Sequence, residues 1–231
     1  MTRIAIIPAR GGSKRIPKKN IKTFLGKPII AYSIEAAIKS DLFNQVIVST
    51  DNIEIAEIAQ QYGATVPFIR SKKNSDDFAT TFDVIKEVLN WYHEQNISIE
   101  LACCLYATAP FINSELLHKA KEKLISNQFD TVFPAIRFSF PIQRAIKMVD
   151  GNGKFNLFQP EYLSSRSQDL EPAFHDAGQF YFFKPTVILE NKKLWTDNSG
   201  IIEIDELLAQ DIDNETDWKL AELKYKLAFG D

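Results

Sequence analysis

Short apolar runs alternate with amphipathic segments along most of the chain. The first run, residues 4–7, is continuously apolar and is followed by Pro8, Gly11 and Gly12. This pattern is typical of a strand that is buried on both faces and ends in a loop. Comparable runs predict further strands at residues 46–48, 65–69, 99–106, 131–136, 178–183 and 200–204.

Apolar residues at helical spacing fill most of the intervals between these strands. They predict helices at about residues 28–39, 52–62, 80–92, 113–124 and 214–228. Asn52 can cap one helix, Thr80 and Asp83 resemble a capping box, and Gly63 suits a helix end. The alternation of strands and helices predicts an α/β fold, with a doubly wound, mostly parallel sheet, right-handed crossovers and helices on both faces.

The alternation stops at residues 137–175. Within this segment, residues 144–149 and 154–158 flank the sequence Asp-Gly-Asn-Gly at 150–153. This arrangement predicts a β-hairpin and no further β–α unit. We therefore expect one domain, residues 1–231, in which residues 137–175 form a small β-rich insertion that projects from the main sheet.

The composition agrees with a globular protein, since 45% of the 231 residues are hydrophobic and 25% are charged. A net charge of −3 gives no general attraction to nucleic acid or to an anionic membrane. No apolar stretch is long enough for a signal peptide or a membrane span. Cys103 and Cys104 are adjacent and would point to opposite faces of a strand, so a disulfide framework is not expected. We expect a soluble, cytoplasmic protein.

Residues 9–22 form a concentrated cationic loop in this acidic protein. The loop has no acidic residue, and its basic residues are Arg10, Lys14, Arg15, Lys18, Lys19 and Lys22. It follows the carboxyl end of the first strand, where open α/β sheets bind ligands, and Gly11 and Gly12 would let backbone N–H groups approach phosphate. We interpret it as a polyphosphate site; the alternative is a solvated basic turn. It matches neither the dinucleotide fingerprint nor the Walker loop.

Asp211 and Asp213 form the second chemical motif. In an extended segment both carboxylates would lie on one face, with Ile212 turned toward the core. Two converging carboxylates suit Mg²⁺ beside substrate phosphates, whereas the alternative role is to cap the helix that begins near Asn214. The basic loop favours the metal site.

Four segments together carry a resemblance to a known family. They are Ile-Pro-Ala-Arg-Gly-Gly-Ser-Lys-Arg-Ile-Pro-Lys-Lys-Asn-Ile at 7–21, Gly-Lys-Pro at 26–28, Val-Ser-Thr-Asp at 48–51 and Asp-Ile-Asp at 211–213. Over nearly its whole length the chain resembles the cytidylyltransferases that activate nonulosonic acids. The resemblance implies transfer of CMP from CTP to the anomeric hydroxyl of a nine-carbon keto-sugar acid, with release of pyrophosphate.

The acceptor is indicated by two further segments. Family members that act on N-acetylneuraminic acid usually have Gln-Pro-Thr-Ser-Pro after the fourth strand, where this chain has Tyr-Ala-Thr-Ala-Pro at 106–110. With Phe-His-Asp-Ala-Gly-Gln-Phe-Tyr at 174–181, this segment resembles the branch that acts on pseudaminic acid. Legionaminic and N-acetylneuraminic acids are alternative acceptors. A non-catalytic nucleotide-binding module is a more distant alternative, against which the two aspartates argue.

The resemblance also implies roles for individual residues. Arg10, Lys19, Asp211 and Asp213 would form the catalytic group, with the two aspartates binding Mg²⁺. The residues expected to bind the nucleotide are Ala9, Arg10, Gly11, Gly12, Ser13, Lys14, Lys19, Asn20, Arg70, Thr80 and Thr81. Those expected to bind the sugar are Tyr106, Thr108, His175, Asp176 and Gln179.

The inserted segment is expected to contribute to the site through a second subunit. The acceptor carboxylate needs a cation, which Arg137, Arg144 or Arg166 could supply. Members of the family use this region to dimerise and to reach the neighbouring site. The apolar residues Phe138, Phe140, Ile142 and Phe158 suit such an interface, and they could equally pack on their own domain. The expected assembly is a homodimer.

Overall fold

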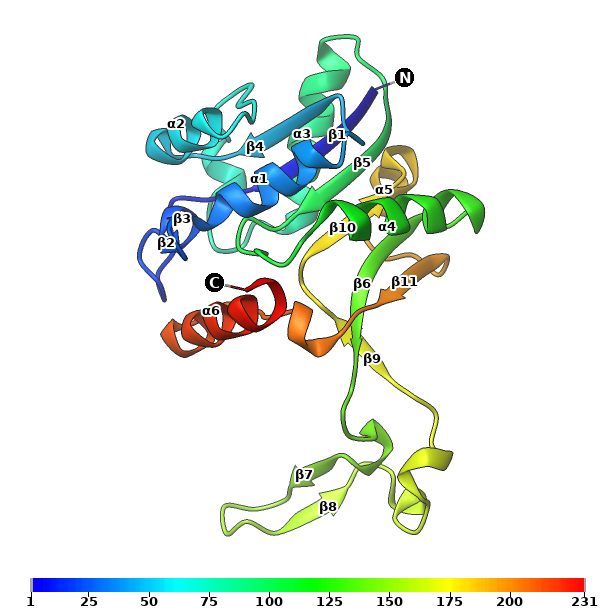
Figure 1. The fold of residues 1–231 in the computed structure, drawn as a ribbon. Coiled ribbons are helices and arrows are strands. Elements are labelled where there is room, and N and C mark those ends of the chain that lie inside the picture. Colours follow the sequence, from blue (N-terminus) through cyan, green and yellow to red (C-terminus); the bar gives the residue numbers. More distant parts are fainter. Residues whose placement is uncertain (1, 231) are drawn as a thin grey trace.

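A seven-stranded sheet lies at the centre of the computed structural model, which describes residues 2–230 (Figure 1). Its strands are β1 (Thr2–Pro8), β4 (Gln45–Ser49), β5 (Ile99–Leu105), β6 (Thr131–Arg137), β9 (Phe174–Asp176), β10 (Phe180–Phe183) and β11 (Ser199–Glu203). Their order across the sheet is β11-β6-β10-β5-β1-β4, and β9 pairs with the carboxyl end of β6. The predicted α/β architecture is confirmed.

The strand directions bring many loops to one edge of the sheet. β1 is parallel to β4 and β5, and β11 is parallel to β6, whereas β10 runs antiparallel between β5 and β6. The carboxyl ends of the parallel strands and the amino end of β10 therefore share one edge. β9 and β10 are the antiparallel exceptions to the mostly parallel sheet, because the chain leaves at the end of β6 and returns from that same edge.

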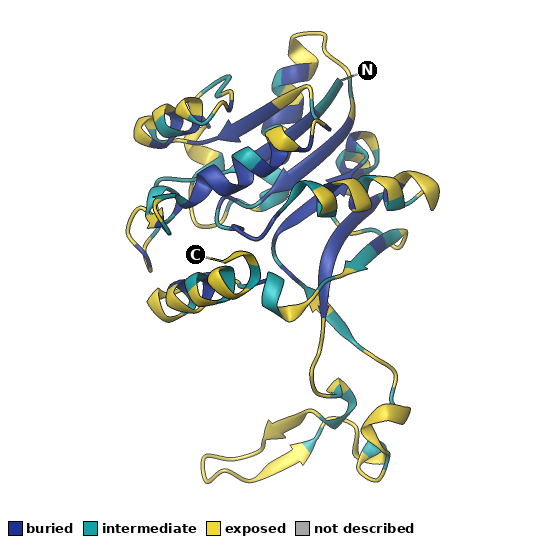
Figure 2. Ribbon diagram, viewed as in Figure 1, coloured by how far each residue is buried: buried dark blue, intermediate teal, exposed yellow. Residues whose placement is uncertain are grey.

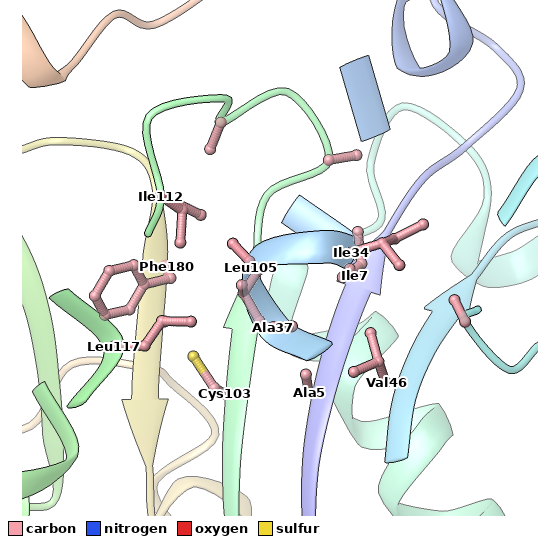
Figure 3. Packing of buried hydrophobic residues seen from close by; sticks show 14 of the residues in the cluster. Ala5, Ile7, Ile34, Ala37, Val46, Cys103, Leu105, Ile112, Leu117 and Phe180 are labelled. Atoms are coloured by element: carbon pink, nitrogen blue, oxygen red, sulfur yellow. The ribbon is translucent and has the colours of Figure 1, made fainter. Parts of the chain in front are cut away.

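Helices cover both faces of the sheet. They are α1 (Ile29–Lys39), α2 (Ile53–Gln61), α3 (Thr81–Glu94), α4 (Ser114–Ser126), α5 (Pro185–Asn191) and α6 (Glu215–Phe229). One core cluster joins the sheet to α1, α2 and α4, and contains Ile7, Ile34, Cys103 and Leu117 (Figure 3). A second cluster joins the opposite face to α3 and α5 and contains Cys104. The strands between the two helical layers are buried (Figure 2), and the two cysteines occupy opposite faces as predicted.

The predicted helix ends are confirmed at several positions. The Asn52 side chain accepts a hydrogen bond from the Ile55 N–H at 3.1 Å at the start of α2, and Gly63 has φ +91° beyond its end. Thr80 and Asp83 form a reciprocal capping box at the start of α3. Local sequence therefore determined where these helices begin and end.

Three local expectations were wrong or incomplete. Residues 65–69 form only the isolated bridges Ile47–Thr65 and Thr50–Ile69, because Pro67 lacks the N–H that a continuous ladder needs. Pro28 precedes α1 in an extended conformation and belongs to a short hairpin, β2 (Thr23–Phe24) with β3 (Lys27–Pro28). The helix α5 was not predicted.

Residues 138–173 form an arm that extends away from the sheet (Figure 1). It carries the hairpin of β7 (Ile146–Met148) and β8 (Phe155–Leu157), which the sequence predicted. Most of its residues are exposed (Figure 2), and Phe140 retains 81% of its accessible surface. At the root of the arm Phe138 contacts His175 of β9, with ring centroids 4.9 Å apart, whereas Phe140, Met148, Phe155 and Phe158 further along the arm are largely exposed.

The C-terminal helix α6 packs on a third core cluster, which contains residues of the basic loop and of the aspartate motif. Trp218 and Ala221 of α6 are buried there with Ile16 of the basic loop and Ile212 of the aspartate motif. This cluster therefore holds the basic loop and the aspartate motif next to each other. Among residues 2–230, no helix combines the length and the apolar character that crossing a bilayer requires.

Candidate active site

Two hollows lie at the edge where the parallel strands end and β10 begins. The first, here called the loop hollow, has a volume of about 300 Å³ and is lined mainly by the basic loop, the segment before α3 and the end of β5. The second, here called the β10 hollow, has a volume of about 500 Å³ and lies beside the start of β10 and the segment that follows β11. Tyr106 lines both, so the two hollows are neighbours across this side chain.

Acidic residues from distant segments neutralise the cations of the basic loop. The Arg10 guanidinium donates to Asp77 at 2.9 Å, and the Lys14 ammonium donates to the same carboxylate at 2.5 Å. The hydrogen bond from Lys14 lowers the pKa of Asp77, and Arg10 adds to the effect. All three residues line the loop hollow, and exposed pairs of this kind are inexpensive to separate.

Two other cations of the loop meet the aspartate motif. Arg15 donates two hydrogen bonds to the Asp213 carboxylate, at 2.7 and 2.9 Å. The Lys19 ammonium donates to the Ile212 carbonyl at 2.6 Å and lies 3.8 Å from Asp213. Burial lowers the pKa of Lys19, and the nearby aspartates oppose this shift. The basic loop and the aspartate motif are therefore in direct contact.

The remaining two cations do not line the loop hollow. Lys18 pairs with Glu54 at 2.7 Å and Lys22 pairs with Glu215 at 2.7 Å. They therefore attach the loop to α2 and α6.

Backbone contacts hold the loop in place. The Gly11 N–H donates to Asp51 at 2.8 Å, and a Cβ at Gly11 would lie only 3.0 Å from the Asn52 Cβ, so a larger residue would force this contact apart. Buried Asn20 donates to the Arg10 carbonyl at 2.9 Å. Asn20 and Ser13 line the hollow, whereas Ala9, Gly11 and Gly12 are not among the lining residues.

Arg70 is a buried cation at the wall of the loop hollow. Its side chain is 3% exposed and lies 3.7 Å from Asp51. Among the described residues, no group accepts a hydrogen bond from its Nε or Nη2. Burial lowers the pKa of Arg70, and Asp51 opposes the shift. A buried guanidinium with unused donors is costly, which indicates a place for an acceptor supplied by a ligand.

Polar side chains from α3 and β5 complete this hollow. Thr80 uses its hydroxyl in the capping box, and the Thr81 hydroxyl lies 3.5 Å from the Tyr106 hydroxyl. Burial raises the pKa of Tyr106, which therefore stays protonated at neutral pH. Thr108 lines the same hollow.

The β10 hollow contains three of the residues predicted to bind sugar, Tyr106, His175 and Asp176. The Asp176 carboxylate accepts one hydrogen bond from the Gly178 N–H at 2.9 Å and another from the Tyr181 hydroxyl. Burial raises the pKa of Tyr181, so its hydroxyl remains a donor. These contacts fix the direction of the carboxylate. His175 is exposed beside it.

Gln179 lies outside the linings of both hollows. It is buried, and its Nε2 donates to the Leu208 carbonyl at 2.5 Å. Its Oε1 has no hydrogen-bond donor among residues 2–230. In the structure, Gln179 thus holds the segment between β11 and the aspartate motif.

The aspartate motif lies at the boundary between the hollows. Ile212 is 1% exposed and enters the third core cluster. Asp213 lines the loop hollow and Asp211 lines the β10 hollow. Burial raises the pKa of Asp211, and the Asp213 charge adds to the shift. The side chain of Asn214 supplies the cap of α6, so neither aspartate is used for that purpose.

The three arginines predicted to supply a cation to the acceptor carboxylate lie elsewhere within one chain. Arg166 pairs with Asp169 at 2.7 Å, and Arg144 donates to Ser167 at 3.3 Å. None of Arg137, Arg144 and Arg166 lines either hollow.

Many residues of the two hollows and their walls were not among the predicted site residues. The polar ones include Asp51, Asp77, Tyr181 and Lys224, together with Arg15, Asn74, Asp76, Glu206 and Gln210. The available signals were weak: Asp51 follows a predicted strand and Tyr181 ends the segment 174–181. Nothing in the local sequence distinguishes Asp77 or Lys224 from a surface charge.

Comparison with known proteins defines the class of enzyme. The profile of the family described as cytidylyltransferase matches residues 4–193. The chain is 44% identical to the pseudaminic acid cytidylyltransferase of Campylobacter jejuni, over 98% of this chain and 97% of that protein. It is 32% identical to the CMP-N,N'-diacetyllegionaminic acid synthase of Legionella pneumophila, over 95% and 94%. The chain belongs to the cytidylyltransferase family, a family of nucleotide-transferring enzymes.

Solved structures support the fold independently. A CMP:2-keto-3-deoxy-manno-octonic acid synthetase complexed with CTP matches with a TM-score of 0.71 and 16% identity, over 99% of each chain. A 4-diphosphocytidyl-2C-methyl-D-erythritol synthase from Anaerococcus prevotii matches with a TM-score of 0.64 and 14% identity, over 97% of this chain and 98% of that one. At these identities the likeness concerns the fold alone.

Proposed function

We propose that this enzyme transfers CMP from CTP to the anomeric hydroxyl of a nonulosonic acid, with release of pyrophosphate, and that pseudaminic acid is the acceptor. Buried Arg70, with unused donors at the wall of a hollow lined by cations, is the observation that carries the nucleotide site. The near full-length similarity to the pseudaminic acid cytidylyltransferase of C. jejuni supports the reaction and the acceptor.

The loop hollow is the proposed site of the nucleotide. Arg10, Lys14 and Lys19 offer cations to the phosphates once Asp77 and Asp213 are displaced from them. Arg70 supplies donors to the cytidine, with Thr80 and Thr81 beside it. The backbone of Ala9, Gly11, Gly12 and Ser13 and the side chain of Asn20 shape the loop around the phosphates.

Asp211 and Asp213 are the proposed ligands of Mg²⁺. Their carboxylate oxygens are the donors that this hard cation prefers, and both lie next to the loop proposed to hold the phosphates. When bound, Mg²⁺ compensates negative charge on the phosphate oxygens. Isothermal titration with Mn²⁺ as a probe tests the assignment: Asp213→Asn should lose binding, and unchanged binding would refute it.

The remaining catalysis follows from positioning and charge. Attack by the anomeric hydroxyl on the α-phosphate increases the negative charge on the phosphoryl oxygens and on the departing pyrophosphate. Arg10 and Lys19 stabilise this charge in a partly buried site, where electrostatic interactions are stronger than in water. Holding both reactants across Tyr106 also removes the entropic cost of bringing them together.

The β10 hollow is the proposed site of the acceptor. His175 and Asp176 line it, Tyr106 separates it from the nucleotide, and Thr108 lies across Tyr106 in the loop hollow. Gln179 supports the adjoining segment through Leu208. The carboxylate of Asp176, directed by Tyr181, can accept hydrogen bonds from acceptor hydroxyl or amide groups.

Pyrophosphate release measures the proposed reaction directly. The purified enzyme is given Mg²⁺ and CTP with pseudaminic, legionaminic or N-acetylneuraminic acid, and ATP, GTP and UTP serve as nucleotide controls. Strong release with CTP and pseudaminic acid alone is expected. Release with another acid keeps the reaction and changes the acceptor. No release with any acid, while CTP still binds, would favour a non-catalytic nucleotide-binding module.

We also propose that the arm joins two chains in a homodimer. It exposes apolar side chains far from its own core, including Phe140 at 81% and Met148 at 77% of their accessible surface. Sedimentation equilibrium at micromolar concentration should show a dimer, and the double variant Phe140→Ser, Met148→Ser should shift it toward monomer. A wild-type monomer at this concentration would contradict the proposal. We further propose that the reaction takes place in the cytoplasm, because a reducing compartment keeps thiols such as Cys103 and Cys104 free.

A further inference from the structure

The β10 hollow has one lysine or arginine among the described residues that line it. This residue is Lys224 of α6, and the carboxylates of Asp176, Glu206 and Asp211 line the same hollow. An acidic acceptor that entered here without a cation would meet like charges on several sides, which is unfavourable at short range. Among the described lining residues, Lys224 is thus the lysine or arginine placed to receive an anion.

Backbone carbonyls hold the Lys224 ammonium in a fixed place. Its Nζ donates to the Glu206 carbonyl at 3.0 Å and to the Ala209 carbonyl at 2.9 Å. A protonated lysine has three N–H donors, so one donor remains after these contacts. Buried Trp218 and Ala221 anchor the same helix to the core. The ammonium is therefore preorganised at the wall of the hollow.

The other cations near the two hollows do not line the β10 hollow. Arg10, Lys14 and Lys19 line the loop hollow, where the phosphates are proposed to bind. Arg137, Arg144 and Arg166 line neither hollow of their own chain. Lys224 is therefore the lysine or arginine that the described residues of this chain itself supply to the acceptor side.

We propose that Lys224 binds the carboxylate of the acceptor acid. In a 2-keto-sugar acid the carboxylate is attached to the anomeric carbon, so fixing the carboxylate also fixes the hydroxyl that attacks CTP. Asp211 lines the same hollow as Lys224, at its boundary with the loop hollow. Lys224 thus orients the anomeric hydroxyl toward the nucleotide. This inference rests on the function proposed above.

Steady-state kinetics with two acceptors test this role. The acceptors are the nonulosonic acid that the wild-type enzyme uses and its carboxamide, in which the anionic group is neutral. Lys224→Met should raise KM for the acid about 10- to 100-fold, as expected for loss of a charge-assisted hydrogen bond, and leave KM for CTP unchanged. For the carboxamide the variant and the wild type should differ little. Lys224→Arg should restore most of the affinity for the acid.

Lys219→Met on an exposed part of the same helix is the matched control for loss of a lysine charge. An unchanged KM for the acid in Lys224→Met overturns the inference. Equal losses for acid and carboxamide also overturn it, since they show that Lys224 only holds the Glu206–Leu208 turn. Failure of the wild-type enzyme with every nonulosonic acid overturns the proposed function and this inference together, so the two failures are distinguishable.

Discussion

Arg15 and Asp213 form a bidentate ion pair, with hydrogen bonds of 2.7 and 2.9 Å, although 198 positions separate them in the chain. The pair joins the basic loop to the aspartate motif. It also places an arginine on a carboxylate that is proposed to bind Mg²⁺. A cation at Asp213 must therefore compete with the guanidinium of Arg15.

Removing Arg15 should strengthen metal binding. We expect Arg15→Gln to increase the affinity for Mn²⁺ about 3- to 10-fold, because a competing bidentate pair at a partly exposed carboxylate is lost. Calorimetric titration without nucleotide measures this affinity. Lys18→Gln serves as the control, because it removes a positive charge from the same loop at a residue that pairs with Glu54 and not with Asp213. Weaker binding in Arg15→Gln would count against the competition.

Asp77 should act as a competitor of the CTP phosphates. It accepts hydrogen bonds from both Arg10 and Lys14 at the loop hollow. Asp77→Asn should lower KM for CTP about 2- to 10-fold, the range expected when two exposed ion pairs no longer need to be broken. Asp197→Asn, an equal charge change on another exposed segment, should leave KM unchanged. A higher KM in Asp77→Asn would show that the carboxylate supports nucleotide binding instead.

Tyr181 should position Asp176 for the acceptor. Tyr181→Phe removes the hydroxyl that donates to this carboxylate, and we expect unfolding free energy to fall by about 1.5–3 kcal/mol and KM for the acid to rise. Tyr92→Phe is the comparison, because its hydroxyl donates to Gln45 outside both hollows. That variant should lose stability without a change in either KM. Urea denaturation and initial rates measure both effects, and an unchanged KM for the acid in Tyr181→Phe would assign Tyr181 to stability alone.

The capping box of α3 should give a pH-dependent contribution to stability. Hydrogen bonds from Thr80 lower the pKa of Asp83 below its ordinary value of 3.8. The contribution is therefore complete at neutral pH and is lost as the pH falls through the lowered value. Asp83→Ala should cost about 1 kcal/mol at pH 7, and the difference from wild type should shrink below pH 3.8. Urea denaturation at pH values from 7 to below 3.8 measures the unfolding free energies of the variant and the wild type. Glu94→Ala at the other end of α3 is the control. A destabilisation by Asp83→Ala that does not change with pH would contradict the assignment.

The fold was predictable because its determinants are local. Continuous apolar runs predicted the central strands, and capping residues such as Asn52 and Thr80 predicted where helices start. The segment 65–69 failed because Pro67 interrupts a run that is otherwise typical of a strand. The helix α5 has only seven residues, too short for a clear helical period.

The chemistry of the loop was predictable, but its charge balance was not. The sequence shows a run of cations without an acidic neighbour, whereas the fold supplies Glu54, Asp77, Asp213 and Glu215 from distant segments. Arg70 was expected from the resemblance to the family, yet its burial follows from tertiary packing. Contacts between segments far apart in the chain leave no periodic signal in a single sequence.

The root of the arm and one wall of the β10 hollow are the same piece of backbone. β6 and β9 pair antiparallel, with Ile136 opposite His175 and Ala135 opposite Asp176, and the Phe138 N–H donates to the Ala173 carbonyl at 2.9 Å just beyond them. A displacement of the arm would therefore be transmitted through β6 and β9 to the backbone of His175 and Asp176. In the proposed homodimer, contacts made by the arm would therefore bear on the proposed acceptor site, and substitutions at the root of the arm are expected to affect both.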